Sequence, residues 1–202
     1  MGMKSLYESI LSSTRTGRIS LIRKWLDEHN IKNYTINDKC EIDVNGRVDL
    51  RVYDFEAFPS YIQFGTVKGD FYWHDKIASL KGAPRKVEKS FFCDYANLTT
   101  LEGAPKEVGG SFYCRYNHLT TLEGSPMKVG GGFYCWKNQL KSLKGAPREV
   151  VGRFDCSDNN LTSLKGAPLK VNEFDCRNNA IQFSKDDVIK VCKVKLEKNI
   201  YV

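Results

Sequence analysis

A short motif returns along most of this sequence at intervals of about 21 residues, and this period constrains the fold more than any other feature. One unit reads FYCRYNHLTTLEGSP from Phe112 to Pro126. The motif cysteine recurs as Cys93, Cys114, Cys135, Cys156 and Cys176. A fixed period in this range is typical of a solenoid, in which each unit forms one coil and buries its apolar side chains against the next coil.

The apolar positions of each unit fit one coil of such a solenoid. Phe112 and Cys114 alternate like the inward residues of a short strand, while Leu119 and Leu122 follow it and Val129 closes the coil. A Gly-Ala-Pro corner then turns the chain, because glycine is conformationally permissive and proline blocks a helix. The unit therefore leaves no room for a helix within the coil.

An asparagine also recurs at a position that should point inward. It is Asn117, Asn138, Asn159 and Asn179 in successive units. Its amide can bond to the backbone of neighbouring coils and satisfy polar groups that the bend would otherwise leave unpaired. We expect a ladder of these side chains, interrupted where Ala96 takes the place of asparagine.

The spacing Phe-x-Cys-x-x-Asn-x-Leu matches the Leu-x-Leu-x-x-Asn-x-Leu of leucine-rich repeats. With the Gly-Ala-Pro corner, it resembles the short-repeat leucine-rich proteins of tailed phages and bacterial effectors, over roughly residues 20–183. The segments 31–38 and 43–46 also resemble the start of those phage proteins. The resemblance implies an α+β fold, a leucine-rich-repeat solenoid whose parallel strands line the concave face.

The two ends of the chain depart from the repeat and are expected to cap the solenoid. Apolar stripes predict helices at residues 5–13 and 18–29, and Asn45-Gly46 between alternating segments predicts a β-hairpin. Ser184 resembles a helix N-cap, with a helix to about Val191 and a lysine-rich tail beyond it. We therefore divide the chain into an N-terminal cap at 1–52, a solenoid at 53–183 and a C-terminal cap at 184–202.

Composition narrows the class of protein further. The chain of 202 residues suffices for one domain, and it has neither a membrane-spanning apolar run nor a secretory signal, so we expect a cytoplasmic protein. Five of its seven cysteines fall at one inward repeat position, which favours buried thiols over disulfides or a metal site. We expect no metal and no cofactor.

Candidate binding residues come from the positions between the inward ones. The column between Phe and Cys holds Tyr72, Phe92, Tyr113 and Tyr134, and turns acidic at Asp155 and Asp175. Aromatic and arginine side chains are enriched at the centres of protein interfaces. The predicted partner-binding set is Tyr72, Phe92, Tyr95, Tyr113, Arg115, Tyr116, Tyr134, Trp136 and Lys137.

The favoured hypothesis is a non-enzymatic scaffold that binds a host or phage protein. The resemblance to phage proteins implies a bacterial host partner, with inhibition of host defence or redirection of a host process as the action. The three histidines, His29, His74 and His118, form no recognisable catalytic or metal-binding arrangement, although His74 and Asp75 with Asp94 are a weak acid–base candidate.

The alternative is nucleic-acid binding. The net charge is +7, whereas residues 1–65 carry nine basic and nine acidic residues, so the excess lies in the solenoid and tail. A ridge follows each proline, running through Arg85-Lys86, Lys106-Glu107, Met127-Lys128, Arg148-Glu149 and Leu169-Lys170. Phosphates could contact this ridge and bases could stack on the aromatic residues, although the alternating glutamates weaken the positive field.

Overall fold

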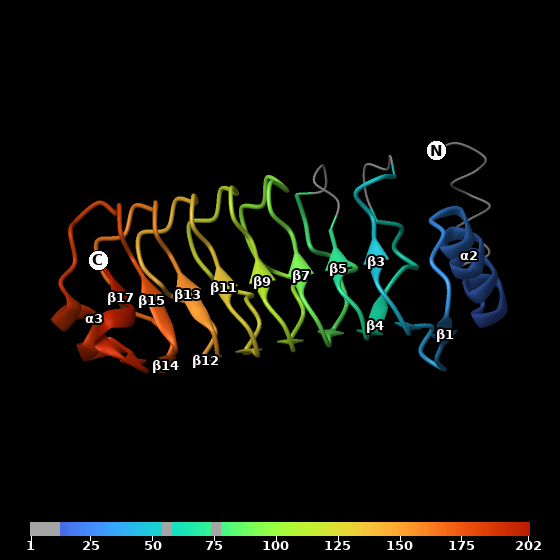
Figure 1. Ribbon diagram of the computed structural model, residues 1–202. Coiled ribbons are helices and arrows are strands. Elements are labelled where there is room, and N and C mark those ends of the chain that lie inside the picture. Colours follow the sequence, from blue (N-terminus) through green and yellow to red (C-terminus); the bar gives the residue numbers. More distant parts are fainter. Residues whose placement is uncertain (1–12, 54–57, 74–77) are drawn as a thin grey trace.

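In the computed structural model the chain forms a solenoid of short parallel strands (Figure 1), as the repeat predicts. The structure describes residues 13–53, 58–73 and 78–202. The coils stack one beside the next, with helix α2 (Arg15–Glu28) at the N-terminal end of the stack and helix α3 (Lys185–Val191) at the C-terminal end. Each coil contributes one strand to each of two sheets.

The first sheet, which we call sheet B, contains the Phe-x-Cys segments. Its eight described strands pair in parallel, and each inward phenylalanine lies in register with the next. The strands are β3 (Val48–Asp49), β5 (Phe71–Tyr72), β7 (Phe91–Phe92), β9 (Phe112–Tyr113), β11 (Phe133–Tyr134), β13 (Arg153–Asp155), β15 (Glu173–Asp175) and β17 (Ile200–Tyr201).

The second sheet, sheet A, was not predicted from the sequence, which indicated a strand only at the Phe-x-Cys segment. Its nine described strands are β1 (Tyr34–Ile36), β2 (Ile42–Val44), β4 (Phe64–Val67), β6 (Lys86–Val87), β8 (Glu107–Val108), β10 (Lys128–Val129), β12 (Glu149–Val150), β14 (Lys170–Val171) and β16 (Lys193–Val194). The recurring valine of each strand points into the core, and the charged residue before it points outward.

The core consists of side-chain ladders that run along the solenoid. The rings of Phe112 and Phe133 are fully buried and stacked, with centroids 5.3 Å apart. The Sγ of Cys114 lies 3.4 Å from the carbonyl oxygen of Tyr134 in the next coil, in position to donate to it. Burial raises the pKa of the Cys114 and Cys135 thiols well above the ordinary value, so both stay protonated and able to donate at neutral pH.

The predicted asparagine ladder is confirmed. Asn138 is buried, and its Nδ2 donates to the carbonyl oxygens of Cys114 and Cys135 while its Oδ1 accepts from the backbone N–H of Leu119. Asn117, Asn159 and Asn179 repeat this pattern in their coils. Each amide therefore links its own coil to the preceding one.

At the N-terminal end, helix α2 covers most of the segment 18–29 predicted to be helical, and Trp25 packs against Phe58 and Phe64. The helix predicted at 5–13 falls almost wholly outside the described residues. The hairpin predicted at Asn45-Gly46 is wrong, because this pair joins β2 of sheet A to β3 of sheet B. Among the described strands the antiparallel pair is β1 with β2, connected through residues 37–41.

At the C-terminal end, the N-cap predicted at Ser184 is confirmed. Its Oγ accepts from the backbone N–H of Asp187, and the Asp187 side chain accepts from the Ser184 backbone in return. The lysine-rich tail then adds one more coil, through β16, a short 3-10 helix (Glu197–Asn199) and β17. The solenoid thus continues into the segment that the sequence assigned to a cap.

Candidate binding surface

Four aromatic rings form a continuous column on the outer side of sheet B. Tyr72, Phe92, Tyr113 and Tyr134 stack in order, with centroid separations of 4.4, 4.7 and 4.8 Å and interplanar angles of 2°, 3° and 7°. All four side chains are half-buried. Since each ring covers the face of its neighbour, this aromatic column offers mainly ring edges and hydroxyl groups to a partner.

A second aromatic group lies beside this column, in the turns that follow the cysteines. Tyr95 stacks on Tyr116 with centroids 4.4 Å apart, and Trp136 meets Tyr116 edge to face at 4.7 Å. Tyr95 is 58% exposed and Tyr116 is 37% exposed, so this turn cluster is the more accessible part of the predicted site. Lys137 follows Trp136 and is exposed as well.

The backbone of these turns does not explain why they carry aromatic side chains. Tyr95, Tyr116 and Lys137 have φ values of 57°, 54° and 59°, in the left-handed region. In this region asparagine, aspartate and glycine are favoured, and the two next coils have Asp158 and Asn178 here. The fold therefore tolerates the tyrosines without needing them, which is typical of positions selected for binding.

Replacing Lys137 by asparagine should stabilise the protein by about 0.5–1 kcal/mol, because asparagine adopts the left-handed conformation at lower cost. The loss of the Lys137–Asp158 ion pair should matter little, since it is long at 3.8 Å and exposed. Urea unfolding measures the change. Lys141→Asn, at an exposed position without positive φ, is the control, and an equal gain there would contradict this explanation.

Arg115 is held in place within the predicted site. Its guanidinium donates to the Asp94 carboxylate at 2.6 and 3.1 Å, and it lies over the rings of Tyr113 and Trp136 at 5.1 and 5.6 Å. The hydrogen bond to Asp94 raises the pKa of Arg115, so the side chain stays charged. The sequence did not identify Asp94 as this partner, because the pairing joins two different coils.

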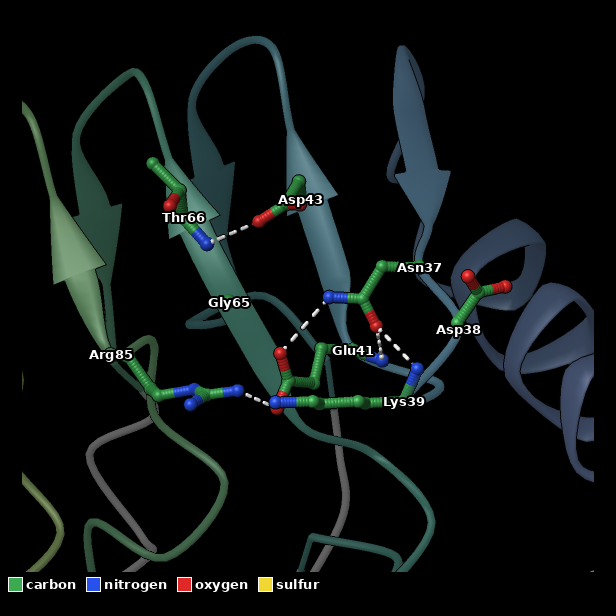
Figure 2. Close-up of a pocket in the computed structure, with 8 residues that line it drawn as sticks. All are labelled: Asn37, Asp38, Lys39, Glu41, Asp43, Gly65, Thr66 and Arg85. Carbon is green, nitrogen blue, oxygen red and sulfur yellow. Dashed lines mark hydrogen bonds and ion pairs between the residues drawn. The ribbon is translucent and has the colours of Figure 1, made fainter.

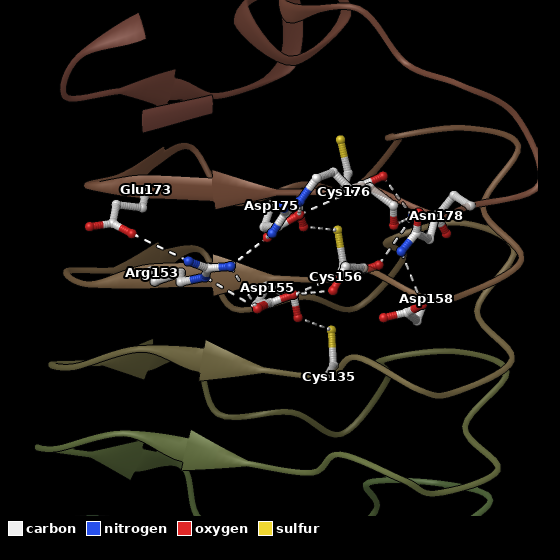
Figure 3. Close-up of polar contacts among 12 residues, drawn as sticks. Cys135, Arg153, Asp155, Cys156, Asp158, Glu173, Asp175, Cys176 and Asn178 are labelled. Carbon is white, nitrogen blue, oxygen red and sulfur yellow. Dashed lines mark hydrogen bonds and ion pairs between the residues drawn. The ribbon is translucent and has the colours of Figure 1, made fainter. Parts of the chain in front are cut away.

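The distal end of sheet B is not the acidic surface that the sequence suggested. Asp175 is fully buried and Asp155 nearly so. Figure 3 shows their carboxylates enclosed by basic side chains: Arg153 contacts both, and Arg177 donates to Asp175 at 2.7 Å. Arg153 and Arg177 also lie over the ring of Tyr201. This network neutralises the acidic residues and ends the accessible aromatic surface.

A polar depression near the N-terminal end of sheet A is closed by its own contacts (Figure 2). The carboxylate of Glu41 accepts from Asn37 at 3.0 Å and pairs with Arg85, while Asp43 accepts from the backbone N–H of Thr66 at 2.6 Å. These side chains satisfy one another and join the first coils. The depression therefore has the character of a structural junction.

The ridge after the prolines lies on the outer side of sheet A, where lysine and glutamate alternate between coils. Lys86 pairs with Glu107 at 3.5 Å, and Lys128 pairs with Glu149 at 3.6 Å. Much of the positive charge in this column is thus offset by the neighbouring coil. The ridge is less basic than a list of its lysines suggests.

The nine predicted partner-binding residues are all described, and they form one surface along β5 to β11 and the turns after β7, β9 and β11. His74 and Asp75, two of the three residues of the acid–base candidate, lie outside the described residues. Within the described part of the chain, no cluster of histidine, cysteine and acidic side chains suits a metal ion. No helix in that part is long and apolar enough to cross a membrane.

Comparison with protein-family models, with curated proteins and with solved structures found no match for this chain. The geometry of the surface is therefore the basis for the functional argument that follows.

Proposed function

We propose that this protein is a non-enzymatic scaffold of the short leucine-rich-repeat type that binds another protein through the aromatic column and the turn cluster. The observation that carries the proposal is the exposure of Tyr95 and Tyr116 at left-handed positions that favour asparagine. Exposed, rigid aromatic side chains contribute large contact areas at low entropic cost, as binding hot spots do.

A protein partner fits this surface better than a nucleic acid. Bases stack on free ring faces, whereas the faces in the aromatic column are occupied by neighbouring rings 4.4 to 4.8 Å away. Arg115 is already paired with Asp94, and half of the lysines of the sheet A column face glutamates. Ring edges, hydroxyls and a fixed guanidinium instead suit the mixed apolar and polar groups of a protein surface.

The resemblance to repeat proteins of tailed phages supports a bacterial protein as the partner, with action inside the host cell. In that setting a binding protein without catalytic groups would act by occupying the surface of a host defence protein or by redirecting a host process.

The test is a variant that removes the turn cluster without disturbing the coil. Tyr116→Asn keeps a residue suited to the left-handed turn, and Trp136→Ala is added to it. If both side chains are hot spots worth about 2 kcal/mol each, the affinity should fall by at least about 100-fold. Tagged full-length protein expressed in bacterial cells captures the partner, and calorimetry then compares both forms with the purified partner.

Lys141→Ala is the matched control, because it alters an exposed residue of a neighbouring coil away from the cluster. Equal capture of the same partner by the wild-type protein and the double variant would rule out this surface. Retention on single-stranded DNA or RNA that falls steeply between low and moderate salt would instead support the nucleic-acid alternative.

A further inference from the structure

The outer side of sheet A carries three large apolar side chains that the repeat does not require. Met127, Val151 and Leu169 are 64%, 55% and 62% exposed. They lie on β10, β12 and β14 or directly beside these strands, at the C-terminal half of the sheet. Scattered apolar residues are ordinary on a surface, but these fall in consecutive coils of one face.

The earlier coils provide an internal comparison for these positions. Where Leu169 and Met127 stand, the preceding units have Arg85 and Lys106. Where Val151 stands, they have Gly109 and Gly130. The coil can therefore be built with charged residues and glycine at these sites, so the fold does not explain the apolar side chains.

Unpaired positive charge surrounds the apolar side chains. Arg148 lies between Met127 and Leu169 in the stack, and Lys170 follows Leu169. In residues 13–53, 58–73 and 78–202, neither cation has an ion-pair partner, whereas Glu149 is already engaged by Lys128. Arg148, Val151, Leu169 and Lys170 line a surface groove of about 420 Å³ together with Asn172.

We propose that this groove over β12 and β14 is a second docking surface, which binds an extended acidic peptide segment that also carries apolar side chains. The apolar groups would cover Val151 and Leu169, and the carboxylates would pair with Arg148 and Lys170. Arginine suits this role because its planar guanidinium binds a carboxylate bidentately. The groove lies on a different sheet from the turn cluster, so one molecule can hold two partners at once.

The same features disfavour two other occupants. A second copy of this chain docked through the same groove would bring the cations of both copies together, because such a contact is self-complementary. A nucleic acid would gain from Arg148 and Lys170 but would place its phosphates against Val151, Leu169 and Glu149. An acidic peptide with apolar side chains matches both parts of the surface.

The test uses the full chain and fluorescein-labelled peptides of about ten residues, long enough to cross the groove in an extended form. The first peptide alternates glutamate and leucine. The second replaces leucine by serine, and the third replaces glutamate by asparagine. We expect fluorescence anisotropy to show binding of the first peptide and at least about tenfold weaker binding of the other two.

The decisive variant is Val151→Gly with Leu169→Lys, which restores residue types found at these positions in earlier coils and so should fold. It should bind the first peptide at least about tenfold more weakly. Tyr116→Asn with Trp136→Ala, on the other sheet, should bind that peptide like the wild-type protein. A single-stranded oligonucleotide completes the set, because the added lysine should strengthen phosphate binding.

The opposite pattern overturns the proposal. If the first peptide does not bind, or if the groove variant leaves its affinity unchanged, the groove is not a site for such a segment. If the oligonucleotide binds more tightly than the peptide and the groove variant strengthens that binding, the surface is a phosphate-binding one. Loss of peptide binding in the Tyr116 and Trp136 variant would assign the peptide to the turn cluster, separately from whether that cluster binds its own partner.

Discussion

Asn138→Ala should lower the free energy of unfolding by about 3–5 kcal/mol. The substitution leaves the carbonyl oxygens of Cys114 and Cys135 and the N–H of Leu119 without the partners that now lie 3.0 Å away. Each buried group left unpaired costs about 1–3 kcal/mol, and alanine supplies no replacement. Because the amide joins two coils, the loss weakens the contact between coils as well as the coil itself.

Urea unfolding followed by circular dichroism measures this effect. Asn160→Ala is the matched control, since Asn160 lies one coil further along but is exposed. It should change the free energy of unfolding by less than about 0.5 kcal/mol. A loss for Asn138→Ala no larger than that of the control would show that the ladder contributes little, and that the coils are held together by the apolar columns alone.

The asparagine ladder could be predicted from sequence because it depends only on the period. Residues 21 positions apart occupy equivalent places in successive coils, so an inward Asn138 implies an inward Asn159. The Phe and Cys columns follow by the same argument, as does the continuous surface of Tyr113 and Tyr134. Any feature that every coil repeats can be derived once the period is known.

Features that depend on contacts between unlike positions could not be derived in this way. Asn45-Gly46 carries a strong local hairpin signal, but both flanking strands pair in parallel with the next coil, and this pairing determines the corner. The second sheet shows only as a single recurring valine per coil, too short a pattern to indicate a strand. The pairing of Arg115 with Asp94 joins different columns of the repeat, so column-by-column reading missed it.

Phe133→Ala should lower the free energy of unfolding by about 4 kcal/mol, through lost burial and the cavity that remains. The ring is fully buried and stacks between Phe112 and Phe154, at 5.3 and 5.6 Å. Stacking adds about 0.5–1.5 kcal/mol per aromatic pair to the effect of burial, so the loss falls on both neighbouring coils. Phe133→Leu fills most of the volume and should cost only about 1–2 kcal/mol.

The position of Phe133 in the middle of the stack has a further consequence. Each coil of a solenoid contacts only its neighbours, so cooperative unfolding depends on every interface along the chain. Weakening the central interfaces should let the coils on either side unfold separately, whereas Phe174→Ala removes a ring near the end and should leave most of the stack as one unit. Hydrogen exchange measures this difference: in Phe133→Ala the protection of β7 and β9 should diverge from that of β13 and β15. Uniform exchange across all four strands, as expected for the wild-type protein, would mean that the coils cooperate through the hydrogen-bonded sheets and the asparagine ladder even without the central ring.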